Sequence, residues 1–487
     1  TNAYIIYNTP ELRSKAKNGV HELINYDGVI MTDSGAYQSW MYKKELEITN
    51  EEIIRFEEIL QPDIATILDV FTDSNDRETV KKGVNMTLER ARECLEIRDP
   101  KKDIIWAAPI QGGQFIDLVK YSAIELSKLD FKYHPIGTLA PALISYDYQR
   151  VAEQIIISRL YSNQSRPLHA FSIGHPMFFA LAVALGADLF DSSAYALFAK
   201  DNRYITSSGT IRLENLMEFP CSCPICLDTT PDELRKMDPK IRIPLLAKHN
   251  LYVTFQELKT IRQAIHQGNL WELVQERCSS HPSLEGALTY ILKKYRTDLI
   301  EFDPITKNSA FFYVNATSFL RPEIQRHLDF MEKRWELPKT VKNVIIFPDL
   351  ETRPIDSWHY QEFMKIFKKN IGDKHQEFQI FILSPIFGLI PEELKEVYPL
   401  SQHEYSFSQE IPPDPIMNFV NQFIKRLNEQ VQKYIFIDFE QIKKQDGEFF
   451  SLDKHFIRYV LTPLNKTRIH IVNFKDFKEY LLKPNEE

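Results

Sequence analysis

Three aspartates each follow directly after a short apolar run: Asp33, Asp69 and Asp191. Continuous apolar runs that alternate with helical segments are typical of parallel strands buried on both faces. The C-terminal ends of such strands meet at one mouth, so we expect the three carboxylates to face a single substrate. Two carboxylates beside a glycosidic carbon perform a retaining substitution, in which one attacks the anomeric carbon and the other handles the leaving group's proton. Taken singly, each aspartate also fits a strand-end or helix-cap carboxylate.

An amide side chain and several glycines lie at the same level of the predicted strands. Gln111 follows the apolar run 104–110 and adds a hydrogen-bonding group there. Glycine has no Cβ, so it lets a flat ring approach the backbone closely. These positions indicate a pocket for a planar ring, and the glycines concerned are Gly35, Gly112, Gly113, Gly137 and Gly174.

A second group of side chains suits a metal ion. Cys221, Cys223 and Cys226 lie within six positions, and His249 follows 23 residues after the last of them. Three thiolates and one imidazole suit tetrahedral Zn2+, and four protein ligands leave no open position for water. We therefore predict a structural zinc site. The alternative is three reduced cysteines in a turn and a histidine at a helix end.

The elements that position these residues alternate between strands and helices over the first 215 positions. Representative segments are the runs 64–68, 104–110 and 168–173 and the helical stretches 51–60, 77–97 and 149–160. Six or so such units, with polar residues at the strand ends, favour a (β/α)8 barrel of the TIM type over an open sheet. A dinucleotide-binding sheet would need a GxGxxG turn, which Asp33-Ser34-Gly35 does not provide. A complete barrel takes about 250 residues, so we expect its first strand or two to be missing here.

The chain is predicted to form three parts. These are a barrel over 1–218, a zinc-binding and helical region over 219–335, and a smaller α/β domain over 343–487. The charged, proline-containing stretch 332–342 is the expected boundary before the last part. The last part is expected to contain strands at 344–347, 378–383, 434–437 and 469–472 and helices at 358–369 and 415–432.

Composition excludes several classes of protein. With 487 residues, 44% hydrophobic and 26% charged, the chain is neither disordered throughout nor a collagen nor a coiled coil. Its longest apolar run, 177–187, is shorter than the roughly 20 residues that span a bilayer, so we expect no membrane partner. The net charge, 59 − 67 = −8, argues against non-specific coating of nucleic acid but leaves room for a local basic groove. Five cysteines form no disulfide scaffold, so a cytoplasmic location is expected.

Several motifs, in order along the chain, resemble those of tRNA-guanine transglycosylases. Residues 32–38 (TDSGAYQ) resemble the family's DSGG(F/Y)Q motif, and residues 186–192 (GADLFDS) resemble its nucleophile strand. The cysteine and histidine spacing matches its zinc site. Residues 169–176, 193–197 and 219–224 are more narrowly similar to archaeal members, which make archaeosine by exchanging guanine 15 of tRNA for preQ0. The resemblance covers about residues 1–330.

The resemblance implies a role for each matching residue. Asp191 would be the nucleophile that bonds to ribose C1′, and Asp33 would be the general acid and base. Aspartate suits the attack because it is already ionised at neutral pH. A base cannot be exchanged inside a stack, so the nucleotide must be extruded into a pocket with aromatic stacking and edge hydrogen bonds. The implied substrate-binding residues are Asp69, Gln111, Gly137, Tyr37 and Ser34.

Four further residues each allow a functional and a purely structural interpretation. Tyr37 alone also fits a core aromatic. Lys200 and Arg203, just past the nucleophile strand, would either meet flanking phosphates or be solvated surface charges. His175 precedes a proline at a predicted helix start, which favours a cap or packing role over catalysis.

The chain departs from the family pattern in three places. The family's chain begins several dozen residues earlier, and archaeal members usually end in an RNA-binding PUA domain that we do not recognise here. Residues 378–405 resemble a segment of archaeosine synthase, a paralogue, although they also fit a packing domain. The expected partners are tRNA, preQ0 or a related 7-deazaguanine base, and either a second copy of the chain or a separate PUA-containing subunit.

Three hypotheses follow, in order of preference. The first is a zinc-containing pentosyltransferase of the archaeal tRNA-guanine(15) transglycosylase type, which acts by double displacement through an aspartyl-ribose intermediate. The second is an archaeosine-synthase-like enzyme that modifies preQ0 already present in tRNA. The third is a catalytically silent tRNA-binding subunit, which the presence of both Asp33 and Asp191 disfavours.

Overall fold

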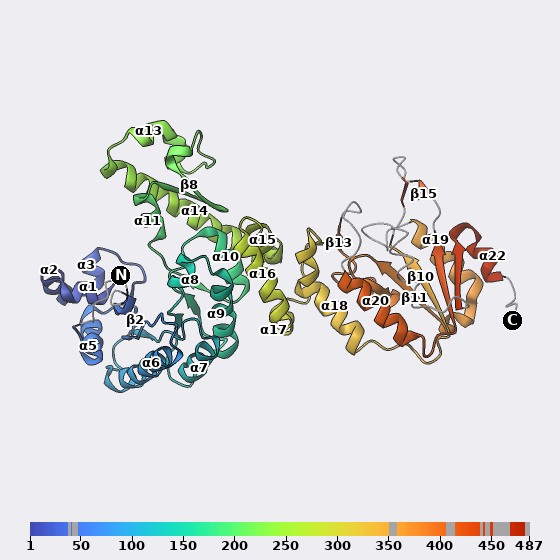
Figure 1. Cartoon of the computed structure of the whole chain (residues 1–487), viewed down its shortest axis with the longest axis horizontal. Helices are drawn as coiled ribbons and strands as arrows, with labels where there is room; N and C mark the ends of the chain where they lie inside the picture. Colours follow the sequence, from blue (N-terminus) through green and yellow to red (C-terminus); the bar gives the residue numbers. More distant parts are fainter. Residues whose placement is uncertain are drawn as a thin grey trace. The chain divides into compact units, whose positions relative to one another are not determined.

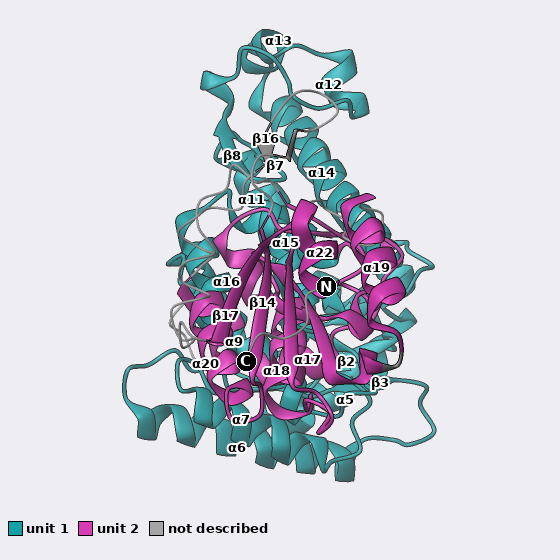
Figure 2. Ribbon diagram, turned by 90° about the vertical axis from the view of Figure 1, so that its right-hand side faces the viewer, with its two compact units in different colours: residues 1–266, 270–291 teal, residues 267–269, 292–487 magenta. Residues whose placement is uncertain are grey.

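The computed structural model describes residues 1–37, 40, 47–349, 358–405, 414–438, 442–443, 449–450 and 468–482. They form two compact units, residues 1–266 with 270–291 (unit 1) and residues 267–269 with 292–487 (unit 2), coloured separately in Figure 2. Both units mix helices with parallel strands, so the predicted α/β class is confirmed. The predicted boundaries between the three sequence regions stay predictions. Within the described ranges, no helix combines the length and the apolarity needed to cross a bilayer.

Six parallel strands run in chain order through unit 1. One sheet holds β1 (Met31–Thr32), β2 (Ile64–Thr66) and β3 (Ile105–Ala107), and the next holds β4 (His134–Ile136), β5 (Leu168–Ala170) and β6 (Leu189–Phe190). Single bridges from Ala107 to Tyr133 and from Ile110 to Ile136 join β3 to β4. The strand ends therefore share one side of the unit, as parallel pairing requires.

Helices alternate with these strands, and Figure 1 shows α6, α7 and α9 along their outer side. The helices are α5 (Asn50–Leu60), α6 (Arg77–Ile97), α7 (Ile116–Ser127), α8 (Ala140–Ile144), α9 (Tyr148–Tyr161), α10 (Pro176–Ala184) and α11 (Ala194–Lys200). Local sequence sets several starts: Thr49 and Glu52 form a capping box at α5, and Asp76 caps α6. The alternation predicted from the sequence is confirmed, whereas closure into an eight-stranded barrel stays a prediction.

Two segments of unit 1 do not follow the alternation of strands and helices. Three short helices precede β1, namely α1 (Ala3–Asn8), α2 (Pro10–Lys15) and α3 (Val20–Ile24). After α11, β7 (Arg203–Thr206) and β8 (Gly209–Arg212) form an antiparallel hairpin. The insert that follows contains α12 (Pro224–Asp228), α13 (Pro231–Lys236) and the start of α14 (Pro239–Gln267). Figure 1 shows α13 beyond β8, with α14 running back toward α15 (Leu270–Cys278).

Unit 2 contains a five-stranded sheet in the order β12-β11-β10-β14-β17. β10 (Asn343–Pro348), β11 (Phe378–Ser384), β14 (Lys433–Asp438) and β17 (Ile469–Asn473) are parallel, and β12 (Gly388–Pro391) is an antiparallel edge. These four parallel strands confirm the four predicted ones. Helices α19 (Trp358–Ile371) and α20 (Asp414–Leu427) make the crossovers. α20 ends earlier than the predicted residue 432, because Gln430 N–H bonds Leu427 O in a tighter turn and Gln432 N–H bonds Lys342 O beside the start of β10.

The remaining described helices and strands belong to neither the six-strand series of unit 1 nor the five-stranded sheet of unit 2. They are α16 (Pro282–Lys294), α17 (Arg296–Phe302), β9 (Phe311–Phe312), α18 (Pro322–Lys333), β13 (His403–Glu404), β15 (Ile442–Lys443), β16 (Phe449–Phe450) and α22 (Phe477–Leu482). Buried strand residues such as Ile345, Phe381 and Phe436 form the core of unit 2.

Candidate active site and metal centre

Asp33 follows β1 and lies among charged and polar groups from three strands. Its Oδ2 accepts a hydrogen bond from Asn2 Nδ2 at 2.9 Å. Removal from water raises the pKa of Asp33 to about 6, against a hydrogen bond from the Gly35 backbone, and the charge of Asp191 adds to the rise. A carboxyl group with this pKa can both give and take a proton near neutral pH.

Asp69 and Gln111 form a buried pair at the ends of β2 and β3. Gln111 Nε2 donates a hydrogen bond to Asp69 Oδ2, and Ser34 Oγ lies 3.5 Å from Asp69 Oδ1. Burial and, to a smaller extent, the charge of Asp33 together raise the pKa of Asp69 to about 7. Gln111 is 2% exposed, and its Oε1 accepts no hydrogen bond from the described residues. The pair therefore offers carboxylate and amide acceptors to a ligand.

Gly137 leaves room for this pair. A Cβ at position 137 would lie 2.1 Å from Gln111 Nε2, which is far inside van der Waals contact. Gly137 N–H bonds Ile110 O at 2.9 Å, so β4 is held tightly against the segment before Gln111. Any side chain at this position would displace the amide from Asp69.

Tyr37 belongs to an aromatic cluster beside the acids. Its ring centroid lies 5.6 Å from that of Trp40 and 5.5 Å from that of Phe71. Phe71 follows Asp69 by two positions, so the cluster joins the segments after β1 and β2. Trp40 and Phe71 were not predicted as site residues, although the position of Phe71, two residues after the strand-end Asp69, could have indicated it.

Asp191 follows β6 and has one carboxylate oxygen held and one free. Oδ1 accepts a hydrogen bond from Ser172 N–H at 3.2 Å and lies 3.1 Å from His169 Nε2. No described residue bonds Oδ2, and the side chain is 58% exposed. The carboxylate is thus oriented through Oδ1 and open to solvent through Oδ2.

His169 and Tyr133 form a buried chain behind Asp191. Tyr133 Oη lies 2.5 Å from His169 Nδ1. Burial raises the pKa of Tyr133 above its ordinary value, so its hydroxyl stays protonated and can donate to Nδ1. With Nδ1 accepting this bond, Nε2 is the ring nitrogen left beside Asp191, and it lies 3.1 Å from Asp191 Oδ1 without a hydrogen bond of regular geometry. Neither contact was predicted from the sequence: His169 lies within the motif 169–176, and no feature of the sequence marks Tyr133.

A fourth carboxyl group, Glu57 of α5, is buried beneath Asp33. Thr32 Oγ1 donates to Glu57 Oε2 at 2.7 Å, while Glu57 Oε1 accepts no hydrogen bond from the described residues. Burial raises the pKa of Glu57 to about 8, and the charge of Asp33 contributes to the rise. Glu57 is therefore mostly protonated at neutral pH and holds the residue next to Asp33.

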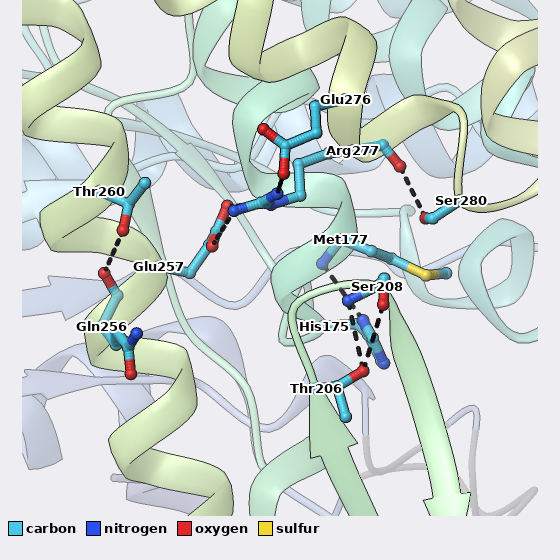
Figure 3. A network of polar contacts seen from close by, with 10 residues as sticks. All are labelled: His175, Met177, Thr206, Ser208, Gln256, Glu257, Thr260, Glu276, Arg277 and Ser280. Atoms are coloured by element: carbon cyan, nitrogen blue, oxygen red, sulfur yellow. Dashed lines mark hydrogen bonds and ion pairs between the residues drawn. The ribbon is translucent and has the colours of Figure 1, made fainter. Parts of the chain in front are cut away.

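The remaining predicted residues lie outside this group of acids. His175 caps α10 by accepting a hydrogen bond from Met177 N–H at 3.3 Å, which confirms its cap role. Figure 3 shows both residues beside the tip of the β7–β8 hairpin. Arg203 Nε pairs with Asp201 Oδ2 at 2.7 Å, and Lys200 is exposed. Contact of either cation with RNA stays a prediction.

The four predicted metal ligands come together in the insert. One donor atom from each of Cys221, Cys223, Cys226 and His249 lies within 4.8 Å of the other three. His249 Nδ1 is 3.3 Å from Cys226 Sγ, and Cys223 Sγ is 3.5 Å from Cys226 Sγ. Sulfur and nitrogen donors so arranged fit a tetrahedral ion such as Zn2+. The cluster is confirmed as a possible metal site.

Neighbouring groups orient the histidine ligand. His249 Nε2 lies 3.0 Å from Ile205 O, so the proton sits on Nε2 and Nδ1 keeps its lone pair for a metal. The next residue, Asn250, accepts from Ile205 N–H at 2.9 Å and donates to Tyr195 O at 3.0 Å. These bonds tie α14 to β7 and to α11, the helix that follows Asp191.

Comparison with known proteins agrees with these features. A family model described as "Queuine tRNA-ribosyltransferase" matches residues 1–283. The tRNA-guanine(15) transglycosylase of Methanocaldococcus jannaschii is 42% identical over 440 residues, 88% of this chain and 64% of the relative. Its namesake from Methanococcus aeolicus is 44% identical over 408 residues, 82% of this chain and 60% of the relative. The namesake from Methanobrevibacter smithii is 40% identical over 478 residues, 96% of this chain and 70% of the relative. The chain thus spans 60–64% of the length of the first two.

Proposed function

The chain belongs to the queuine tRNA-ribosyltransferase family, and on that premise we propose that it exchanges guanine 15 of archaeal tRNA for the 7-deazaguanine preQ0. The feature that supports this function most is the meeting of Asp33 and Asp191. They are 158 positions apart in sequence, yet the charge of Asp191 raises the pKa of Asp33. Two carboxyl groups that interact across one pocket are what a retaining exchange at a glycosidic carbon needs.

In the first half of the exchange, Asp191 Oδ2 attacks ribose C1′ of the extruded nucleotide. The C1′–N9 bond breaks, a C1′–Oδ2 bond forms, and Asp33 gives its proton to the departing guanine. In the second half, N9 of the incoming base attacks C1′, Asp33 takes the proton from N9, and Asp191 leaves as a carboxylate. Two inversions at C1′ restore the original configuration.

His169 and Tyr133 act on this step as positioning residues. Ser172 N–H bonds Oδ1 of Asp191 and His169 Nε2 lies 3.1 Å from the same oxygen, so the attacking lone pairs are those of Oδ2. The Tyr133 hydroxyl donates to Nδ1 of His169, which leaves Nε2 beside Asp191. A nucleophile held in this way needs less reorganisation to reach C1′.

The base binds between the hydrogen-bond acceptors of Asp69 and Gln111 and the ring of Tyr37. Asp69 accepts from N–H groups on the edge of the purine, and this gain favours the ionised form of a carboxyl group whose pKa is about 7 in the free protein. Gln111 offers the buried Oε1, which has no donor among the described residues. Tyr37 stacks on the ring, and the missing side chain of Gly137 leaves the base edge accessible.

The metal site holds Zn2+ as a structural ion in this proposal. Cys221, Cys223, Cys226 and His249 would supply all four ligands, so the ion contributes a cross-link and no reactive water. The cross-link would fix α14 to the turn of the insert. The hydrogen bond from Asn250 to Tyr195 O then connects α14 to α11, the helix that follows the nucleophile.

Base exchange into unmodified tRNA tests the function. The measurement is incorporation of radiolabelled guanine or preQ0 by the wild type, by Asp191→Ala and by Asp33→Ala. Exposed Asp117→Asn on α7 serves as the matched control, because it changes a carboxylate outside the pocket. We expect exchange by the wild type and the control and none by Asp191→Ala. Failure of the wild type to exchange, with metal bound and the fold intact, would overturn the proposal for this chain.

A further inference from the structure

One face of α14 is exposed from Lys248 to Arg262. Lys248, Tyr252, Phe255, Lys259 and Arg262 are exposed and recur at intervals of four, three, four and three residues. This spacing places them in one stripe along a helix. Tyr252 is 48% exposed and Phe255 is 57% exposed. The buried residues of the same helix, such as Asn250, Glu257 and Ile261, lie on the opposite face.

The helix that carries the stripe is basic in a chain that is acidic overall, and three of its cations belong to the stripe. α14 contains five Lys and Arg residues and one acidic residue, so its balance is 5 − 1 = +4, against −8 for the chain. That acidic residue, Glu257, is 3% exposed and is held by Arg277 through two contacts of 2.8 and 3.1 Å (Figure 3). The stripe therefore presents cations and aromatic rings with no carboxylate among them.

The three cations of the stripe are also unneutralised by neighbours. No described carboxylate lies within 4.0 Å of Lys248, Lys259 or Arg262. The nearby Arg203 and Arg235, by contrast, pair with Asp201 and Asp232. Like charges lined up without counter-charges raise the local potential and attract a polyanion.

We propose that this stripe is a docking surface for tRNA outside the base-exchange pocket. Lys248, Lys259 and Arg262 contact phosphates, while Tyr252 and Phe255 pack against bases or riboses. From Lys248 to Arg262 the helix rises about 21 Å, enough to follow about six nucleotide steps of 3.4 Å. The inference rests on the proposed function in one respect, namely that the RNA bound here is the substrate tRNA.

The buried face of α14 connects the stripe to the pocket. Asn250 Nδ2 donates to Tyr195 O of α11 at 3.0 Å and to Arg203 O at 3.2 Å. α11 starts three positions after Asp191. RNA that docks on the stripe is therefore held by the same unit that carries the nucleophile, which favours the presentation of one nucleotide to Asp191.

The test compares two triple variants in tRNA binding as a function of salt. The first is Lys248→Ala, Lys259→Ala and Arg262→Ala. The matched control is Lys81→Ala, Arg92→Ala and Lys101→Ala, which removes the same charge from exposed positions on and after α6. Alanine favours helix, so both variants are expected to fold.

We expect the stripe variant to bind tRNA at least about tenfold more weakly near physiological salt. The slope of log Kobs against log[salt] should fall by about one for each phosphate that the variant no longer neutralises, whereas the control keeps the wild-type slope. Tyr252→Ala with Phe255→Ala should weaken binding about tenfold with an unchanged slope, because stacking releases no counterions. In exchange assays, the stripe variant should raise KM for tRNA and leave kcat unchanged.

Three results would separate the possible failures. If the wild type exchanges bases while the stripe variant keeps the wild-type affinity and slope, the stripe proposal is wrong and the function stands. If the wild type fails to exchange but the stripe variant still binds more weakly and with a reduced slope, the docking surface stands and the function is wrong. If the stripe variant changes the oligomeric state by light scattering and not the salt slope, the stripe is a protein interface and the proposal is overturned.

Discussion

The acids at the strand ends, which we propose as the base pocket, and the candidate metal centre belong to the same unit, yet they are assembled in opposite ways. The pocket draws its acids from the ends of β1, β2 and β6, and Asp33 and Asp191 are 158 positions apart. The metal centre takes all four donors from residues 221–249. The pocket therefore exists only when the parallel strands have assembled, whereas the metal centre needs one short segment and its ion.

The two sites also differ in how fully their polar atoms are bonded. In the pocket, Gln111 Oε1 and Glu57 Oε1 are buried and accept no hydrogen bond from the described residues. In the metal centre, His249 Nε2 is bonded to Ile205 O while Nδ1 faces two thiols. An unfilled buried acceptor destabilises a protein by roughly 1–3 kcal/mol. The difference agrees with the proposed function, in which the unfilled acceptors beside the acids receive a ligand and the Cys/His cluster would hold a structural ion.

Removal of the metal should have the largest effect on folding. Binding of structural zinc to small domains contributes roughly 10–16 kcal/mol, which is also folding free energy. Chelation or Cys223→Ser is therefore expected to unfold the insert and to lower the melting temperature and base exchange together. Elemental analysis, calorimetry and limited proteolysis within 219–250 provide the measurement. Cys94→Ala, at a buried cysteine outside the cluster, is the control. Metal-free protein with unchanged melting and exchange would contradict the structural role.

Asp33→Asn should change the chemistry and leave the insert intact. Loss of a positioned general acid and base reduces kcat/KM by about 10²–10⁴-fold. Release of guanine needs the protonated carboxyl group, whose pKa is about 6, so single-turnover release should slow as pH rises through about 6. This pH limb should be absent in Asp33→Asn, while metal content and melting stay as in the wild type. Persistence of the limb in the variant would assign it to another group.

His169→Phe should have a smaller effect, because it removes an orienting contact and no reacting group. A misplaced nucleophile reduces kcat by about ten- to hundredfold, with little change in KM for tRNA. His169→Gln, whose amide nitrogen can take the place of Nε2, should recover part of the rate. Tyr133→Phe should reduce kcat less than His169→Phe, since the hydroxyl acts only through the imidazole. A rise in KM at unchanged kcat would show that His169 serves binding instead.

Glu57→Gln should have the smallest effect on base exchange and should act mainly on the pH dependence of stability. The pKa of Glu57 is about 8 in the folded protein and 4.5 ordinarily. Between these values the folded state keeps a proton that the unfolded state has lost, so stability falls as pH rises from about 5 to 8. Removing the carboxyl group should abolish most of that fall, which is on the order of 3 kcal/mol, measured by urea unfolding at both pH values. Glu89→Gln, at an exposed site on α6, should leave it unchanged.

Features encoded in local sequence could be predicted. Apolar runs ending in polar residues indicated the strand ends at Asp33, Asp69 and Asp191, because parallel strands share an edge. The CxCxxC spacing indicated the metal ligands, and His175 before a proline indicated a cap. The same reasoning predicted the four parallel strands of unit 2, whose apolar runs are uninterrupted.

Contacts made between distant segments could not be predicted in the same way. Tyr133 meets His169 only because the segments of β4 and β5 pair in one register, which their short apolar runs do not specify. Glu57 looked like one of several acids on an amphipathic helix, and its burial beneath Thr32 depends on how α5 packs. The β7–β8 hairpin was likewise not expected within a run of strand and helix units.

Covalent capture of tRNA by Asp191 is the measurement that separates the pocket from the metal centre most directly. The wild type is incubated with unmodified tRNA in the absence of free base, then denatured, separated by gel and mapped by mass spectrometry. We expect an adduct that carries ribose on Asp191, disappears when guanine or preQ0 is added, and is absent in Asp191→Asn with its metal still bound. Base exchange by a wild type that forms no adduct, or an adduct on a residue other than Asp191, would contradict the double displacement.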